Sequence, residues 1–433
     1  LTFCIFKGGK NLKGYEKINI NNGINLMLIP RDNYKTNIVT VYLKRPLKRD
    51  EVTKNSLIPS VLKSATVGYP NPIAIAKKLQ DLYGSTIGVS VDKMGERQVL
   101  SFRMYCVGDM YLPEPVFEDS LAMLKEIILH PLTKDGGFVK EYVDIEKTIL
   151  EEDIKSKINN KGHYAVEKCI EHMCKQEPFS ISEDGYIEDL AEIDEKSLYS
   201  HYKEIIETSP IDIVIAGSFD RDKIIETVKS KFNFERKELV KIDKEQIYKK
   251  PEASYITEEM DINQGKLVLG LRTNMDYKDE KYYNLMMFSA VLGSGAHSKL
   301  FLNVREKHSL CYSIYSSLEK LKGLMFISAG IEISDYDKAL ELISKELDDM
   351  KQGNITSEEL TNSKKFIINN LKSLNDNLSA LTDYYYSMSI QDSNRTIDDV
   401  INLVSKVEIS DIVEVGKEIY LDTVYFLTGK SNN

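Results

Sequence analysis

The order of hydrophobic and polar positions repeats along the chain. Residues 84–91 and 98–104 are two β-rich runs around a short polar segment, and the first of them alternates apolar with polar side chains. Residues 309–316 and 323–330 follow the same order around a turn at 318–322. Because short β-rich runs separated by a polar turn are typical of antiparallel hairpins, the pattern predicts one hairpin in each half of the chain.

Helical periodicity follows each predicted hairpin. Apolar residues recur at helical spacing over 117–128 in the first half and over 336–347 in the second. A second helix is predicted after each of these, near residues 137–157 and 357–374. The two halves therefore share the elements that come after the hairpin as well as the hairpin itself.

This repeat sets the predicted domain organisation. Both halves close on an apolar β-run, at 211–217 and at 423–429. The matching order predicts two homologous α+β domains, residues 1–233 and 261–433, each an antiparallel-rich sheet with helices packed on it. The segment 234–260 is charged, lacks periodicity and contains a helix-breaking proline, so we predict that it is the linker.

Composition and charge narrow the class of partners. The chain has 433 residues, with 57 Lys and Arg against 67 Asp and Glu, for a net charge of −10. This charge repels phosphate backbones and anionic lipids, so we expect no binding to nucleic acid. No apolar run approaches the ~18 residues of a membrane-spanning helix, and the first seven residues resemble no secretion leader. We therefore expect a cytoplasmic protein that does not bind a membrane.

Cysteine and histidine spacing gives no local metal motif. The five cysteines are scattered without a CxxC pair, which argues against disulfides and thiolate metal sites and favours a reducing compartment. They are Cys4, Cys106, Cys169, Cys174 and Cys311. No two of the six histidines lie three to five residues apart, the spacing that zinc ligands on one helical face normally show.

One continuous segment carries a resemblance to a known family. Residues 292–316 read LGSGAHSKLFLNVREKHSLCYSIYS. They closely resemble the second-domain pattern LGxGxxSRLFxxVREKxGLxYSxYS of the pitrilysin/insulinase family of inverted-motif zinc peptidases. The departures are Lys299 in place of Arg and Ser309 in place of Gly. The two-domain repeat and the chain length are similar to those of the short, dimeric members, so the resemblance implies half of a processing-peptidase-like clamshell.

The resemblance also implies two substrate-binding residues, Arg305 and Tyr312. In the family an Arg and a Tyr at these positions hold the substrate backbone. A guanidinium and a phenol can both donate hydrogen bonds to peptide carbonyls whatever the substrate sequence. The alternative is structural: Arg305 pairs with Glu306 or another carboxylate, and Tyr312 packs between sheet and helix.

The family's zinc motif HxxEH is replaced in this chain. By position it falls on the helix expected over 56–66, where Ser60, Lys63 and Ser64 stand for His, Glu and His. Hydroxyls are poor zinc ligands, and an ammonium repels the cation and cannot serve as general base. The best match to the family's third ligand is Glu152, which alone cannot retain catalytic zinc and is expected to be a solvated charge or the partner of Lys63.

The resemblance and the lost motif together give a functional expectation. The chain is expected to bind no metal or other cofactor and to cleave no peptide alone. It would be the non-zinc subunit of a zinc-dependent processing peptidase, helping an HxxEH-bearing, zinc-containing partner to bind a peptide or small-protein substrate. The alternative is a homodimeric peptide-binding or structural protein without proteolytic activity.

Overall fold

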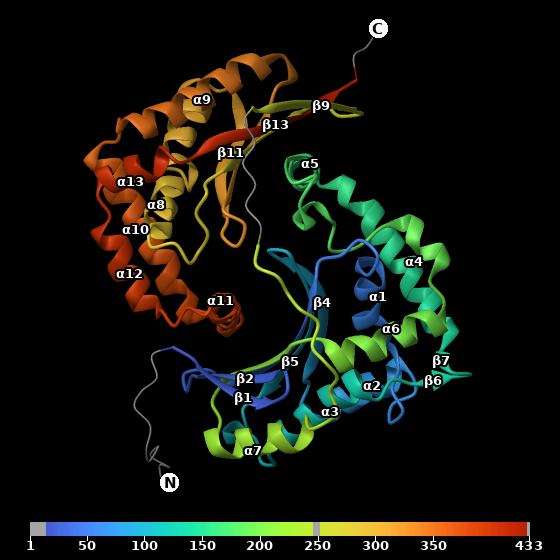
Figure 1. Cartoon of the computed structure of the whole chain (residues 1–433). Helices are drawn as coiled ribbons and strands as arrows, with labels where there is room; N and C mark the ends of the chain where they lie inside the picture. The colour runs from blue at the N-terminus through green and yellow to red at the C-terminus, as the bar shows by residue number, and fades with distance from the viewer. Residues whose placement is uncertain (1–13, 246–251, 431–433) are drawn as a thin grey trace.

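The computed structural model describes residues 14–245 and 252–430, and Figure 1 shows the arrangement of the two halves. Cys4, the residues compared with a secretion leader and Pro251 of the predicted linker lie outside the described residues. Within the described residues no helix is both long enough and apolar enough to cross a membrane. The four cysteines in these ranges are buried and free of disulfides.

The first half is built on a six-stranded sheet with the strand order β1-β2-β8-β3-β5-β4. All neighbouring strands are antiparallel except β2 and β8. The strands are β1 (Glu16–Asn21), β2 (Ile24–Pro30), β3 (Thr36–Pro46), β4 (Thr86–Met94), β5 (Arg97–Val107) and β8 (Ile211–Gly217). A separate two-stranded ribbon consists of β6 (Thr133–Lys134) and β7 (Gly137–Phe138). The predicted first hairpin is confirmed as β4 and β5.

Helices of the first half pack mainly on one face of this sheet, with α1, α3 and α6 against its central strands. The helices are α1 (Val52–Ser64), α2 (Pro72–Asp81), α3 (Phe117–Leu129), α4 (Lys140–Ser156), α5 (Lys161–Met173), α6 (Glu195–Thr208) and α7 (Arg221–Lys231). Short 3-10 turns are η1 (Asp109–Tyr111), η2 (Lys157–Asn159), η3 (Pro178–Ser180) and η4 (Ile187–Glu192).

Strand β3 explains why both faces of the sheet are apolar. Val39, Val41 and Leu43 join the core formed with α1 and α3, whereas Ile38 and Tyr42 join the core of the second half. Successive side chains of a strand point to opposite faces, so a continuous apolar run is expected where both faces are covered.

The second half contains a five-stranded sheet with the order β11-β12-β10-β13-β9. Its strands are β9 (Ser254–Met260), β10 (Gly265–Arg272), β11 (Cys311–Glu319), β12 (Leu324–Ile331) and β13 (Tyr420–Gly429). The second predicted hairpin is confirmed as β11 and β12. The predicted linker 234–260 needs correction at its end, because β9 pairs with β13 and so belongs to the sheet. Residues of β9 alternate between half-buried and exposed, as expected of an edge strand.

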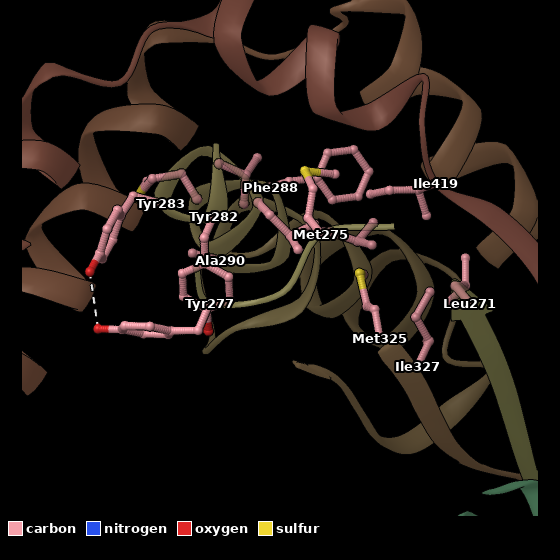
Figure 2. Close-up of a cluster of buried hydrophobic side chains, with 14 of the residues drawn as sticks. Leu271, Met275, Tyr277, Tyr282, Tyr283, Phe288, Ala290, Met325, Ile327 and Ile419 are labelled. Carbon is pink, nitrogen blue, oxygen red and sulfur yellow. Dashed lines mark hydrogen bonds between the residues drawn. The ribbon is translucent and has the colours of Figure 1, made fainter. Parts of the chain in front are cut away.

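Helices of the second half enclose a large core of aliphatic and aromatic side chains (Figure 2). The helices are α8 (Tyr282–Gly293), α9 (Tyr336–Gln352), α10 (Ser357–Ser373), α11 (Leu378–Ile390), α12 (Ile397–Lys406) and α13 (Ile409–Gly416). A π-helix, η5 (Leu300–Lys307), and two 3-10 turns, η6 (Ile333–Asp335) and η7 (Leu374–Asp376), complete this half. In the core the Tyr283 hydroxyl donates to that of Tyr277 at 3.0 Å. The α+β fold of two sheets covered by helices is confirmed.

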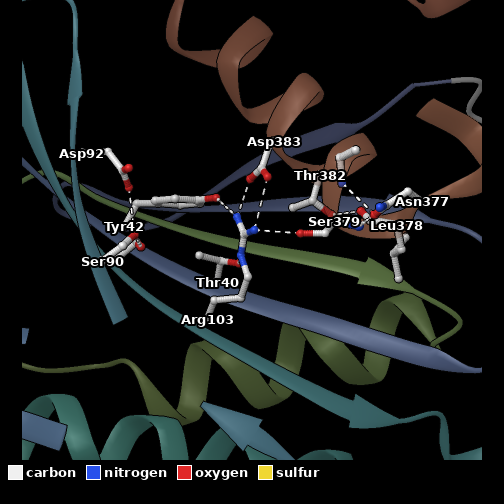
Figure 3. Close-up of polar contacts among 12 residues, drawn as sticks. Thr40, Tyr42, Ser90, Asp92, Arg103, Asn377, Leu378, Ser379, Thr382 and Asp383 are labelled. Carbon is white, nitrogen blue, oxygen red and sulfur yellow. Dashed lines mark hydrogen bonds and ion pairs between the residues drawn. The ribbon is translucent and has the colours of Figure 1, made fainter. Parts of the chain in front are cut away.

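Each half also covers the sheet of the other. Helix α5 packs against β10, β12 and β13, and α11 packs against β8. On the first sheet, Tyr42 stacks on Tyr386 with ring centroids 3.7 Å apart. Nearby, Arg103 of β5 donates to the Tyr42 hydroxyl at 2.8 Å and forms an ion pair with Asp383 of α11 (Figure 3).

A buried charge network crosses the same boundary. Arg272 of β10 pairs with Asp422 at 2.7 Å and with Glu177 of the first half at 2.6 Å. Lys322 lies 2.6 Å from both Glu177 and Glu96. Removing one partner from such a network leaves a charge buried without compensation, at a cost of about 3–5 kcal/mol. The two halves are therefore fixed relative to each other by specific contacts as well as by apolar packing.

Candidate functional site

Helix α1 carries the three positions assigned to the lost zinc motif. Its sheet-facing side is formed by Leu57, Ile58, Val61 and Leu62, which are almost completely buried. Ser60 and Ser64 are half-buried and Lys63 is exposed, so the three positions lie outside the apolar stripe of the helix. Residues at i and i+4 share a helical face, which places Ser60 and Ser64 one above the other.

Helix α4 packs against this side of α1 and presents a carboxylate to it. The Ser64 hydroxyl lies 2.9 Å from Glu146 Oε1, to which it donates, and 3.1 Å from the backbone oxygen of Ser60. We call Ser60, Lys63, Ser64 and Glu146 the α1–α4 surface. The sequence analysis missed Glu146, which has no spacing signal relative to α1 and is recognised only from the contact between the helices.

The two carboxylates of α4, Glu146 and Glu152, lie differently with respect to α1. Glu152 is exposed on α4, whereas Glu146 faces Ser64. At about 100° per residue, the six steps from Glu146 to Glu152 turn the helix by about 600°, which leaves the side chains about 120° apart. No ion pair joins Glu152 to Lys63 within the described residues. Glu146, and not Glu152, therefore faces Ser64, and the assignment of Glu152 to the third-ligand position stays a prediction.

The residues on the α1–α4 surface do not fit a zinc ion. The nearest side chains offer two hydroxyls, one ammonium and one carboxylate, and a catalytic zinc site needs three imidazole or carboxylate ligands. Across the described residues no cluster of three or more His, Cys, Asp or Glu is arranged to hold a metal. The contact between Ser64 and Glu146 is an ordinary interhelical hydrogen bond.

Buried polar side chains hold the start of α1 in place. His201 Nε2 lies 2.8 Å from Asn55 Oδ1, and the Asn55 amide donates to Gln98 at 2.7 Å. Burial disfavours the charged imidazole and lowers the pKa of His201 to about 4. His201 is therefore neutral at pH 7 and serves as a structural hydrogen-bond partner rather than as an acid or base.

The second candidate region lies where η5 leads into β11. The turn between them places Ser309 at a φ of +51°, a left-handed conformation that glycine adopts at lower cost. The backbone N–H of Leu310 donates to Val304 at 3.1 Å, which closes the turn. Lys299, the other departure from the family pattern, is buried and pairs with Glu359 of α10 at 2.9 Å. Both substitutions are accommodated without loss of the local structure.

Tyr312 projects from the edge of the second sheet. The register between β11 and β12 shifts between Cys311 and Ser313, and Tyr312 occupies the resulting bulge, with 62% of its surface exposed. Bulges re-aim a side chain at sheet edges. The Tyr312 hydroxyl donates to Glu332, which follows β12, and this hydrogen bond raises the pKa of the phenol. Tyr312 thus does not pack between sheet and helix, and its proton is engaged by Glu332 rather than offered to a peptide carbonyl.

Arg305 lies on η5, directly before the same turn. Its guanidinium stacks on Phe301 at 4.5 Å from the ring centroid, and 38% of the side chain is exposed. Arg305 forms an ion pair with Glu306 at 3.7 Å, the pairing of the structural alternative, at a distance too long for a hydrogen bond. The guanidinium therefore keeps donors directed to solvent. We call Arg305, Tyr312 and Glu332 the η5–β11 surface.

Comparison with known proteins places this geometry in a family. The chain is 31% identical over 409 residues to the "Probable inactive metalloprotease YmfF" of Bacillus subtilis, covering 94% of this chain and 96% of that protein. The family model described as "Peptidase M16 inactive domain" matches residues 192–366. The chain belongs to the peptidase M16 family.

Solved structures agree with the M16 fold. A "conserved protein" from Enterococcus faecalis superposes with a TM-score of 0.90 at 29% identity, covering 97% of this chain and all of that one. A "peptidase M16 inactive domain" from Pseudomonas fluorescens superposes with a TM-score of 0.77 at 16% identity, covering 96% and 98%. The pitrilysin/insulinase resemblance read from residues 292–316 is thus confirmed, and this M16 chain has a degenerate zinc site.

Proposed function

We propose that this M16 chain binds extended peptides at the η5–β11 surface and does not hydrolyse them itself. In this proposal it is the non-zinc subunit of a processing peptidase, and a homologous HxxEH-bearing subunit supplies the metal and the general base. The observation that carries the proposal is the contrast between its two surfaces. The α1–α4 surface has no metal-binding set, whereas Arg305 is partly exposed near the end of η5 and Tyr312 is exposed on a bulge of β11.

The open edge of the second sheet supports a peptide ligand. Strand β11 is an edge strand, and Tyr312, Ser313, Tyr315 and Ser317 along it are exposed. Helix α5 covers β10, β12 and β13. Strand β11 has no strand partner on its outer side among the described residues, and edge strands present backbone groups that pair with extended segments.

The heterodimer proposal is tested with the partner's own activity. The zinc-bearing relative from the same organism is assayed with and without this chain, using a quenched peptide substrate. Arg305→Ala removes a donor to a peptide carbonyl, and Tyr312→Phe removes a hydroxyl oxygen that can accept from a peptide N–H. Each should lower kcat/KM of the mixture by about tenfold. Tyr255→Phe is the matched control, because Tyr255 is equally exposed, at 64%, on the opposite edge of the same sheet.

The outcomes separate the two candidate functions. Cleavage that does not depend on this chain or its variants would overturn the heterodimer. Peptide binding by the purified chain alone, still weakened by Arg305→Ala, would then favour the homodimeric peptide-binding protein. Loss of the complex in the Arg305→Ala variant would indicate that Arg305 holds the partner rather than the peptide.

A further inference from the structure

Glu332 brings a carboxylate to the peptide-binding surface. It directly follows β12, opposite the start of β11, because the register pairs Cys311 with Ile331. The bulge turns Tyr312 toward it, and the Tyr312 hydroxyl donates to Glu332 Oε1. The pair therefore links the adjacent ends of two strands at an exposed corner of the second sheet.

The Tyr312–Glu332 pair can accept hydrogen bonds from a ligand but has no proton left to donate to one. A phenol has one proton, and here that proton is given to Glu332. The remaining lone pairs of Tyr312 and both oxygens of an ionised carboxylate can only accept. A ligand group that meets this pair must therefore donate, as a peptide N–H or an ammonium does.

The negative charge of Glu332 has no cationic partner among the described residues, so a cationic ligand can balance it. The ion pairs among residues 14–245 and 252–430 include no Lys, Arg or His within 4.0 Å of Glu332. Arg305, the cation of the same surface, has its ion-pair contact with Glu306. The net charge of −10 further favours the approach of a cationic ligand.

Arg305 and the Tyr312–Glu332 pair are complementary. The guanidinium offers only donors, which suit a peptide carbonyl, and the pair offers only acceptors. We propose that Glu332 is a specificity-determining residue of the η5–β11 surface. It selects peptides with a lysine or arginine side chain, or a free N-terminal ammonium, beside the peptide unit that Arg305 holds. This inference rests on the proposed peptide-binding function.

The test uses binding of two matched peptides to the purified full-length chain. Both are N-acetylated and C-amidated, and they differ only in one lysine replaced by norleucine. By fluorescence anisotropy the lysine peptide should bind about two- to fivefold more tightly, the range of an exposed ion pair. Glu332→Gln should remove this preference, and Glu259→Gln, an exposed glutamate on β9 with the same charge change, should keep it.

Two further variants separate failure of the inference from failure of the function. Arg305→Ala should weaken both peptides equally and preserve the lysine preference, and Tyr312→Phe should also preserve it because Glu332 stays charged. If Glu332→Gln leaves the preference unchanged while Arg305→Ala weakens both peptides, the role of Glu332 is overturned and peptide binding stands. If neither peptide binds the wild-type chain, the proposed function fails and this inference with it.

Discussion

The α1–α4 surface and the η5–β11 surface show two different consequences of replacing residues of a family motif. On α1, Ser60, Lys63 and Ser64 replace all three motif side chains, and the helix persists because its sheet-facing side is apolar and buried. Near η5 the replacements are Lys299 and Ser309. Lys299 forms an ion pair with Glu359, and Ser309 adopts the left-handed conformation of the turn. The first set removes metal chemistry and leaves the fold intact. The second set preserves the position of exposed polar groups.

Fold and site are therefore separable in this chain. Burial of α1 supplies its stability, and the outward positions contribute only an interhelical hydrogen bond between Ser64 and Glu146. Function must be argued from the side chains of a site, since one fold hosts both active and inactive versions of it.

Rebuilding the zinc motif should produce the largest effect. Ser60→His, Lys63→Glu and Ser64→His together place two imidazoles one turn apart, opposite Glu146. We expect the variant to bind one zinc with a Kd on the order of 1 μM or tighter, measured by competition with a chromogenic chelator after dialysis. The wild-type chain should retain no stoichiometric zinc under the same conditions.

Two additions to the rebuilt variant test which carboxylate completes the site. Glu146→Gln should weaken zinc binding at least about tenfold, as loss of one ligand does, and Glu152→Gln should leave it unchanged. A variant that folds but takes up no metal would show that the α1–α4 surface has lost more than its ligands. Sensitivity to Glu152 instead of Glu146 would contradict the helix geometry.

Acid should destabilise the region that holds α1. His201 has a pKa of about 4 in the folded chain against 6.5 for an ordinary imidazole, so between these values only the unfolded state binds the proton. Stability should therefore fall as pH falls from 6.5 to 4, by about 3 kcal/mol in total. Urea denaturation across this range measures it, and His201→Gln, which keeps a hydrogen-bond donor for Asn55, should show a flatter profile. Equal profiles for the two proteins would exclude the buried neutral imidazole.

The smallest effect is expected at the turn before Tyr312. Ser309→Gly should stabilise the chain by about 0.5 kcal/mol, because glycine adopts the positive φ with less strain but loses more entropy on folding. Peptide binding should not change. Ser313→Gly on β11 is the control and should destabilise by a similar amount, since glycine weakens an extended strand. Destabilisation by Ser309→Gly would mean that the serine side chain itself supports the turn.

The sequence alone determined the repeat, the α+β class and the family. Alternation and helical spacing depend on local sequence, so the two hairpins and the helices after them could be located from the pattern at 84–104 and 309–330. The loss of HxxEH could also be recognised from the sequence, because its three positions lie within five consecutive residues of one helix.

Contacts between groups distant in sequence depend on how the helices and strands pack. Glu146 faces Ser64 because two helices pack at a particular rotation, and Glu332 meets Tyr312 because a bulge shifts the register of two strands. The strand assignment of β9, placed in the linker from its polar sequence, depends on pairing with β13, which is distant in the chain. Each of these outcomes follows from contacts between segments far apart in sequence, and local periodicity contains no information about the rotation or register that creates them.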